Sequence, residues 1–246
     1  MGLFDYFSKE AALERKRQGA HKRLTNMYVQ SQDRMAAAAE LATLAADGDQ
    51  EAFRILMLRF NLLNPSQVID QQEKEDTLSL LLGIGDQAQE WAKAWILKTS
   101  EGIHWPMRFL QHSLSDDDYR AFLAEAIAAT EAGYSRDPKK KLVLVQLAGE
   151  YPNEEIRREV PKFLEDHDEQ VRFHAVDVVE RIQCPDAQVA LCTRWASEEE
   201  SSGRIYHAIA EIFAKNGWNV DVASLDVLRE RAPQGVRIGD DGMVTR

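Results

Sequence analysis

The sequence lacks the residues and motifs on which most enzymatic and metal-binding chemistry depends. Its 246 residues include only two cysteines, Cys184 and Cys192, which are too few for a disulfide framework or a zinc site. It contains no nucleophile elbow, no P-loop, no H-E-x-x-H pattern and no dinucleotide-binding glycine pattern. We therefore expect no catalytic residue, no cofactor and no metal, and the sequence predicts a protein that is not an enzyme.

Long hydrophobic runs are missing as well. The longest run, LSLLLGIG at residues 78–85, is far too short to span a bilayer. The first residues, MGLFDYFSKE, lack the order of a signal peptide, in which basic residues precede an apolar core. From these two absences we expect a cytoplasmic protein.

Positive charge is scarce, and it is unevenly distributed. The chain has 30 Lys and Arg against 41 Asp and Glu, so its formal net charge is −11. Nucleic-acid binding depends on basic side chains placed against phosphates, so a chain this acidic is a poor general binder of DNA or RNA. Residues 1–35 are the exception: seven basic and four acidic residues give them +3, which leaves −14 for the remaining 211 residues. This pattern predicts a basic arm that docks on the acidic body or on a partner.

Strand patterns are nearly absent before residue 233, whereas helical patterns run through the whole chain. Apolar residues recur at spacings of three and four, and breaks follow every 12–18 residues. Two helix pairs repeat: 153–165 with 168–182, then 185–197 with 200–213, at offsets of 32 and 34 residues. An earlier helix, 137–149, aligns with 168–180 at an offset of 31. Such repetition favours stacked helical hairpins over a closed bundle.

The segment DEQVRFHAVDVVERI, residues 168–182, resembles the second helix of a HEAT repeat. The preceding helix contains Pro161, which suits a family whose first helices are often kinked. The resemblance is closest over 153–182, extends over 116–215 and weakens over 31–115. It implies a HEAT-like, armadillo-type α-solenoid: an all-α, right-handed α-α superhelix with a curved surface for partners. The matching residues are Asp168, Val171, Arg172, Ala175, Val178 and Val179.

Three segments follow from these patterns. Residues 1–30 form an aromatic and basic arm or cap, and residues 31–232 form the HEAT-like α-solenoid. Residues 233–246 form a C-terminal tail or a small β-hairpin, because VRI and MVT flank the turn sequence GDDG.

The helix 168–182 has two faces with different expectations. Val171, Ala175 and Val178 share one stripe, which predicts burial, and His174 at its edge is better explained as a flanking residue than as a metal ligand. The opposite face carries Phe173 with Asp177 and Glu180. An aromatic ring beside acids is typical of a binding surface. Alternatively, Phe173 packs on the adjoining helix and the two acids form a solvated face.

We expect a non-catalytic interaction scaffold whose acidic surface binds a protein partner with a basic surface. One form of this function would be the neutralisation of a basic, nuclease-like toxin, since some bacterial immunity proteins look like HEAT arrays. The predicted partner-binding residues lie on the two repeated second helices and on the aromatic N-terminal segment. They are Phe173, Asp177, Glu180, Arg204, His207, Glu211, Phe4 and Phe7.

Two other functions compete with this one. Some HEAT-like repeat proteins are DNA glycosylases that use tryptophans and an Asp in a basic groove. Trp91 and Trp95 share a helix face here, but the acidity of the chain favours core packing for this pair. The second alternative is a membrane-recruited adaptor that uses residues 1–17, where apolar side chains are followed by cations.

Overall fold

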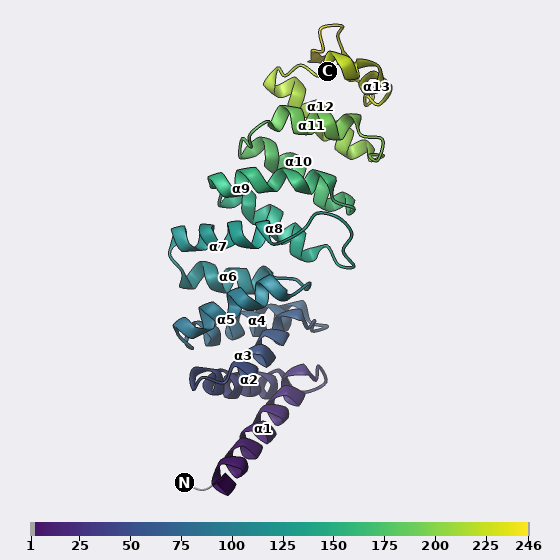
Figure 1. Cartoon of the computed structure of the whole chain (residues 1–246). Coiled ribbons are helices and arrows are strands. Elements are labelled where there is room, and N and C mark those ends of the chain that lie inside the picture. Colours follow the sequence, from purple (N-terminus) through teal and green to yellow (C-terminus); the bar gives the residue numbers. More distant parts are fainter. Residues whose placement is uncertain (1–2, 246) are drawn as a thin grey trace. The chain divides into compact units, whose positions relative to one another are not determined.

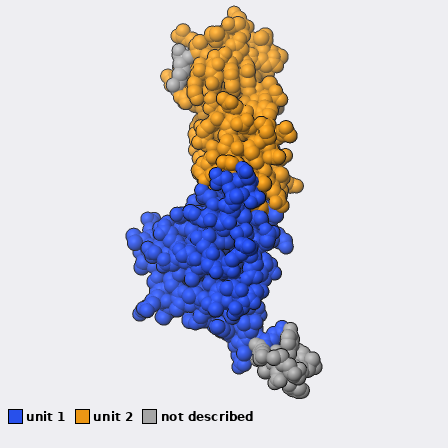
Figure 2. All heavy atoms as spheres, turned by 90° about the vertical axis from the view of Figure 1, so that its left-hand side faces the viewer, with its two compact units in different colours: residues 1–119 blue, residues 120–246 orange. Residues whose placement is uncertain are grey.

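The structure is a computed structural model that describes the backbone of residues 3–245 and the side chains of residues 10–245. The chain divides into two compact units, Met1–Tyr119 and Arg120–Arg246, which are coloured separately in Figure 2. Helices make up nearly all of the regular structure, and the described part of the chain contains a single two-stranded sheet. The expected all-α fold class is therefore confirmed.

The helices of the first unit stack in two rows, which can be followed in Figure 1. One row runs from α2 to α4 to α6, and the other runs from α1 to α3 to α5. Contacts between α1 and α2 and between α5 and α6 join the rows into helix pairs. The elements are α1 (Leu3–Thr25), α2 (Ser31–Ala46), α3 (Gln50–Met57), η1 (Leu58–Asn61), α4 (Gln67–Leu82), α5 (Asp86–Lys98) and α6 (His104–Ser113), followed by α7 (Asp116–Ala128), which contains the unit boundary.

The second unit repeats this arrangement. Helix α10 contacts α8 on one side and α12 on the other, while η2, α11 and α13 form the second row. These contacts are consistent with a helical repeat. The elements are α8 (Lys139–Glu150), α9 (Glu154–Glu159), η2 (Val160–Glu165), α10 (Glu169–Arg181), α11 (Ala187–Ala196), α12 (Gly203–Asn216), η3 (Val222–Ser224), α13 (Leu225–Glu230), β1 (Arg237–Ile238) and β2 (Val244–Thr245).

Local sequence explains where these elements begin and end. The Asp168 carboxylate accepts hydrogen bonds from the backbone N–H groups of Gln170 and Val171, at 2.9 and 3.2 Å, and so caps α10. Pro161 cannot donate a backbone hydrogen bond, and the chain passes there from α9 into the 3-10 turn η2. At the C-terminal end, β1 and β2 pair in an antiparallel hairpin. A hairpin was one of the two structures expected for residues 233–246.

The apolar stripe of α10 lies in the core of the second unit. Val171 and Ala175 are fully buried and Val178 is 2% exposed, as the spacing predicts. The close approach of α8 depends on Gly149, because a Cβ atom there would lie 3.3 Å from Val178 Cγ2 and still closer to the Arg181 guanidinium. Burial of this stripe stabilises the packing around α10.

Buried ion pairs link successive helix pairs at regular intervals. Lys141, in the first turn of α8, lies 2.6 Å from the Asp166 carboxylate, which precedes α10. Arg172, in the first turn of α10, donates from Nε to the Glu200 carboxylate at 2.8 Å, and Glu200 precedes α12. The two cations are 31 residues apart and the two acids 34 apart, which are the offsets of the repeat. The same kind of buried ion pair therefore links successive helix pairs twice in this unit.

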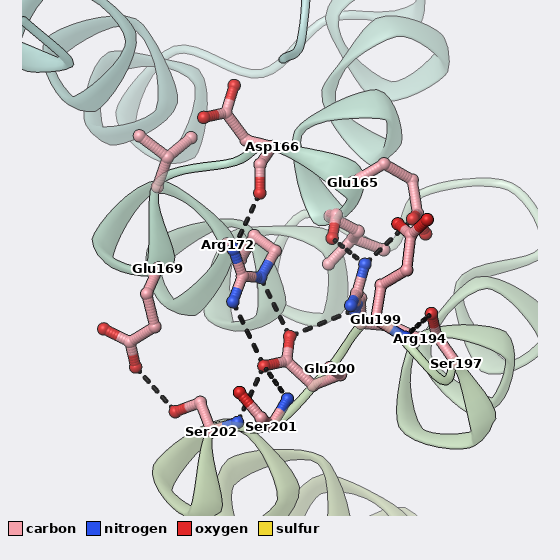
Figure 3. Close-up of polar contacts among 12 residues, drawn as sticks. Glu165, Asp166, Glu169, Arg172, Arg194, Ser197, Glu199, Glu200, Ser201 and Ser202 are labelled. Atoms are coloured by element: carbon pink, nitrogen blue, oxygen red, sulfur yellow. Dashed lines mark hydrogen bonds and ion pairs between the residues drawn. The ribbon is translucent and has the colours of Figure 1, made fainter. Parts of the chain in front are cut away.

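Glu200 lies at the centre of the second of these ion-pair clusters, which is shown in Figure 3. Its carboxylate also lies 3.0 Å from Arg194 Nε, and it accepts hydrogen bonds from the backbone N–H groups of Ser201 and Ser202. Burial alone would raise the pKa of Glu200, but the Arg172 hydrogen bond, the Ser202 N–H and the two positive charges hold it below its ordinary value. Glu200 therefore stays ionised in the interior.

Candidate functional site

A solvent-open groove of about 670 Å³ lies between α10 and α12. Its floor is apolar and its rim is charged, with Phe173 at the N-terminal end of the α10 wall. Three acids and one lysine make up the rim. The lining residues are Phe173, Val176, Asp177 and Glu180 from α10, and Ala208, Glu211, Ile212, Ala214 and Lys215 from α12.

Two sets of polar contacts between α10 and α12 bracket the groove. At its N-terminal end, Glu169 pairs with Arg204 and accepts a hydrogen bond from Ser202 Oγ at 2.6 Å. At its C-terminal end, the Glu180 carboxylate accepts hydrogen bonds from Lys215 Nζ at 3.2 Å and from Asn216 Nδ2 at 3.1 Å. Polar contacts between the two helices therefore lie at both ends of the groove.

Phe173 has a double role. The Arg204 guanidinium lies over its ring, with Cζ 4.5 Å from the ring centroid. The His174 ring is inclined to the Phe173 ring at 70°, and the two ring centroids are 5.9 Å apart. The ring is half-buried and also lines the groove. Both readings of the sequence thus describe part of the structure: Phe173 packs against a side chain of the adjoining helix, and it also presents aromatic surface to the groove.

The acids of the rim differ in how far they are engaged. The Asp177 side chain is 68% exposed, and its carboxylate is 3.7 Å from Arg181, a loose surface pair. The Glu180 side chain is 17% exposed and is held by Lys215. Glu211 is exposed on the α12 wall. The rim therefore carries more negative than positive charge, most of it accessible to a partner.

Four of the eight predicted binding residues come together in this groove: Phe173, Asp177, Glu180 and Glu211. Arg204 and His207 are exposed on α12 but do not belong to the groove lining. The Phe4 and Phe7 side chains lie outside the part of the chain whose side chains the structure describes.

Sequence reasoning missed Lys215 and the apolar floor. Lys215 follows Arg181 by 34 residues, and both are basic residues in the last turn of their helices. Arg181 does not line the groove, so the repeat offset alone would not have identified Lys215. The floor residue Ile212 corresponds to the buried Val178 at the same offset, but the alignment alone does not show which of them faces a groove.

A second, smaller pocket adjoins the groove and shares Glu180 with it. This pocket has a volume of about 360 Å³ and is lined partly by Cys184, Asp186 and Trp218. Burial raises the pKa of the Cys184 thiol to about 11, so this cysteine is a poor nucleophile. The pocket therefore extends the groove's surface without adding a reactive group.

The tryptophan pair of the first unit lies at a different kind of surface. Trp91 and Trp95 are half-buried on α5 and line a pocket of about 500 Å³ between α3 and α5, rather than lying in the core as expected. Phe53 occupies the core position instead, with its ring 5.5 Å from that of Trp91. Two basic residues line this pocket, Arg54 and Lys98, and Arg54 is held by a bidentate pair with Glu51 at 2.8 Å, so the pocket does not form a basic groove.

Among the described residues, no three His, Cys, Asp or Glu side chains are grouped so that they could hold a metal ion. No described helix combines the length and the hydrophobicity needed to cross a membrane. Comparisons with protein-family models, with curated proteins and with solved structures give no match. The groove must therefore be interpreted from its own chemistry.

Proposed function

We propose that this protein is a non-catalytic interaction scaffold that holds a protein partner with a basic surface in the groove between α10 and α12. The observation that carries the proposal is the composition of the groove: a partly open phenyl ring, an apolar floor and a rim of three acids against one lysine. Apolar and aromatic area supplies affinity at protein interfaces, and charge complementarity sets approach and specificity. An acidic rim fits a basic partner.

We also propose that the helix pairs of each unit form a HEAT-like, right-handed α-α superhelix. Three features support this: the two-row stacking, the break at Pro161, and the ion pairs that recur at offsets of 31 and 34 residues. In a solenoid each helix pair contacts only its neighbours, so recurring ion pairs between successive helix pairs are expected. A crystal structure in which successive pairs were related by a left-handed rotation would contradict this proposal.

The functional proposal is tested by reversing charge in the groove. The variant Asp177→Lys/Glu211→Lys should lose a basic protein that the wild-type chain captures from a native lysate. The matched control is Glu125→Lys/Glu131→Lys, which makes the same change in net charge at two exposed positions of the same unit. Retention by the control and loss by the groove variant support the proposal.

Three results would count against it. Equal capture by the wild type and the groove variant would show that the partner binds elsewhere. Salt-dependent binding of the wild type to DNA would favour the nucleic-acid alternative. Sedimentation with liposomes that is lost on substitution of Phe4 and Phe7 would favour the membrane adaptor.

A further inference from the structure

Phe173 already receives a guanidinium group from its own chain. The Arg204 side chain lies over the ring at 4.5 Å and is held there by the Glu169 carboxylate. An aromatic face with a flanking carboxylate is therefore a guanidinium site that this surface demonstrably forms. The groove side of Phe173 repeats these ingredients, since Asp177 follows one turn later on the same helix.

The groove provides carboxylates on both of its walls. Asp177 on α10 and Glu211 on α12 are 34 residues apart and occupy equivalent positions in the repeat. A planar guanidinium presents five N–H donors in a fixed fork, so it can contact two carboxylates while it stacks on a ring. A lysine ammonium is a compact, strongly hydrated charge that gains less from the same arrangement.

The surface extends beyond a single side-chain site. The neighbouring pocket shares Glu180 and adds Asp186 and Trp218, which is a second combination of acid and aromatic ring. From Phe173 to Cys184 the α10 helix and its end span eleven residues, or about 16 Å at the helical rise per residue. An extended segment of roughly five residues covers that distance.

We infer that the groove recognises an extended, arginine-bearing segment of the partner, with one guanidinium placed against Phe173 between the Asp177 and Glu211 carboxylates. This inference rests on the proposed function and makes it more specific, because it separates arginine from basic charge in general. The Arg204 contact remains in place, since Arg204 is not part of the groove lining.

The test compares two capped peptides, hexa-arginine and hexa-lysine, by fluorescence anisotropy with the full-length chain at about 0.15 M salt. We expect the arginine peptide to bind about threefold to tenfold more tightly than the lysine peptide. Phe173→Leu keeps an apolar side chain but removes the ring, so it should abolish this preference and weaken the binding of the arginine peptide more than that of the lysine peptide. Circular dichroism confirms that the variant is folded.

Neutral variants locate the binding site. The variant Asp177→Asn/Glu211→Gln should bind both peptides more weakly than the wild type. The control Glu125→Gln/Glu131→Gln should bind both as tightly as the wild type. If the two peptides bind equally but the groove variant loses both, arginine selectivity is wrong and the proposed function stands. If neither peptide binds, or if groove and control variants lose binding equally, both proposals are overturned.

Discussion

Each of the two units contains a buried carboxylate between two arginines, but the carboxylates come from different kinds of element. In the first unit it is Glu73, in the middle of α4, which accepts from Arg34 Nε at 3.1 Å and from Arg59 Nε at 3.0 Å. In the second unit it is Glu200, in the turn before α12. All three members of the first cluster are at most 2% exposed.

The constant feature is the arginine, not the acid. Arg34 and Arg172 are each the fourth residue of their helix, α2 and α10. Both also donate from Nη1 to carbonyls of the loop just before that helix, to Val29 in the first case and to His167 in the second. The guanidinium thus fixes the entry of the chain into the helix, and a carboxylate from a later element neutralises it.

The buried carboxylates of Glu73 and Glu200 stay charged in their units for the same reason. Burial would raise the pKa of Glu73, but the hydrogen bond from Arg34 and the charges of Arg34 and Arg59 lower it overall. The same balance lowers the pKa of Glu200. Buried charges are costly unless they are paired and hydrogen-bonded, so each cluster is stable only as a complete set.

The largest expected effect comes from removing either carboxylate. Glu73→Gln and Glu200→Gln should each lower the free energy of unfolding by about 3–5 kcal/mol, because one buried guanidinium, that of Arg34 or Arg172, loses its paired carboxylate. The second arginine of each cluster keeps another carboxylate, Asp70 or Glu165. Urea unfolding followed by circular dichroism measures the loss. A similar loss in both variants would show that a turn and a helix hold the acid equally well.

The control for this experiment is Glu165→Gln. Glu165 also pairs with Arg194, at 2.8 Å, but its side chain is 55% exposed. Its replacement should cost less than about 1 kcal/mol. If Glu200→Gln were as mild as Glu165→Gln, the cluster in the second unit would contribute nothing beyond a surface pair.

The second-largest expected effect is on the free energy of unfolding at low pH. Because the folded-state pKa values of Glu73 and Glu200 are lowered, their stabilising contribution is complete above the unfolded-state pKa of about 4.3 and is lost as the pH falls through the folded-state values. In Glu200→Gln the acid side of the stability profile should be shallower by up to about 1.4 kcal/mol per pH unit. Unfolding free energies measured between pH 6 and pH 3 in roughly half-unit steps test this; an unchanged slope would show that Glu200 titrates normally.

Local patterns predicted much of the fold but neither cluster. The buried stripe of α10 and the hairpin, one of the two structures expected for residues 233–246, follow from neighbours within a few residues, and the structure contains both. Glu200, by contrast, stands in the run SEEESS, which indicates only a polar turn. Three consecutive glutamates share that signal, and only packing against Arg172, 28 residues earlier, decides which of them is buried.

The same limit applies to the candidate site. Repeat offset and helix periodicity were enough to place Phe173, Asp177 and Glu211 on one surface. They did not show that Arg204 would be engaged by Glu169 and by the Phe173 ring, because that depends on how closely α12 approaches α10. Periodicity gives the face of a helix on which a side chain lies, whereas its contacts depend on the distance to the next helix.

The smallest expected difference between the units lies in their aspartate caps. The Asp49 carboxylate caps α3 by accepting from the N–H groups of Glu51 and Ala52, both at 3.1 Å, and it also pairs with Arg17 at 2.9 Å. Asp168 caps α10 in the same way. Asp168→Ala should lower the free energy of unfolding by about 1 kcal/mol, and Asp49→Ala should lower it further, because it also breaks the pair with Arg17.

Substitution by asparagine separates the two contributions, since asparagine caps a helix about as well as aspartate but carries no charge. Asp168→Asn should therefore be nearly neutral in urea unfolding, while Asp49→Asn should still destabilise the chain slightly, because the half-buried Arg17 loses one of its two carboxylate partners and keeps only Glu14. If both asparagine variants were neutral, the Arg17 pair would contribute nothing to stability. The link between α1 and the start of α3 would then depend on apolar contacts, such as those of the buried Ala20 and Leu24, rather than on charge.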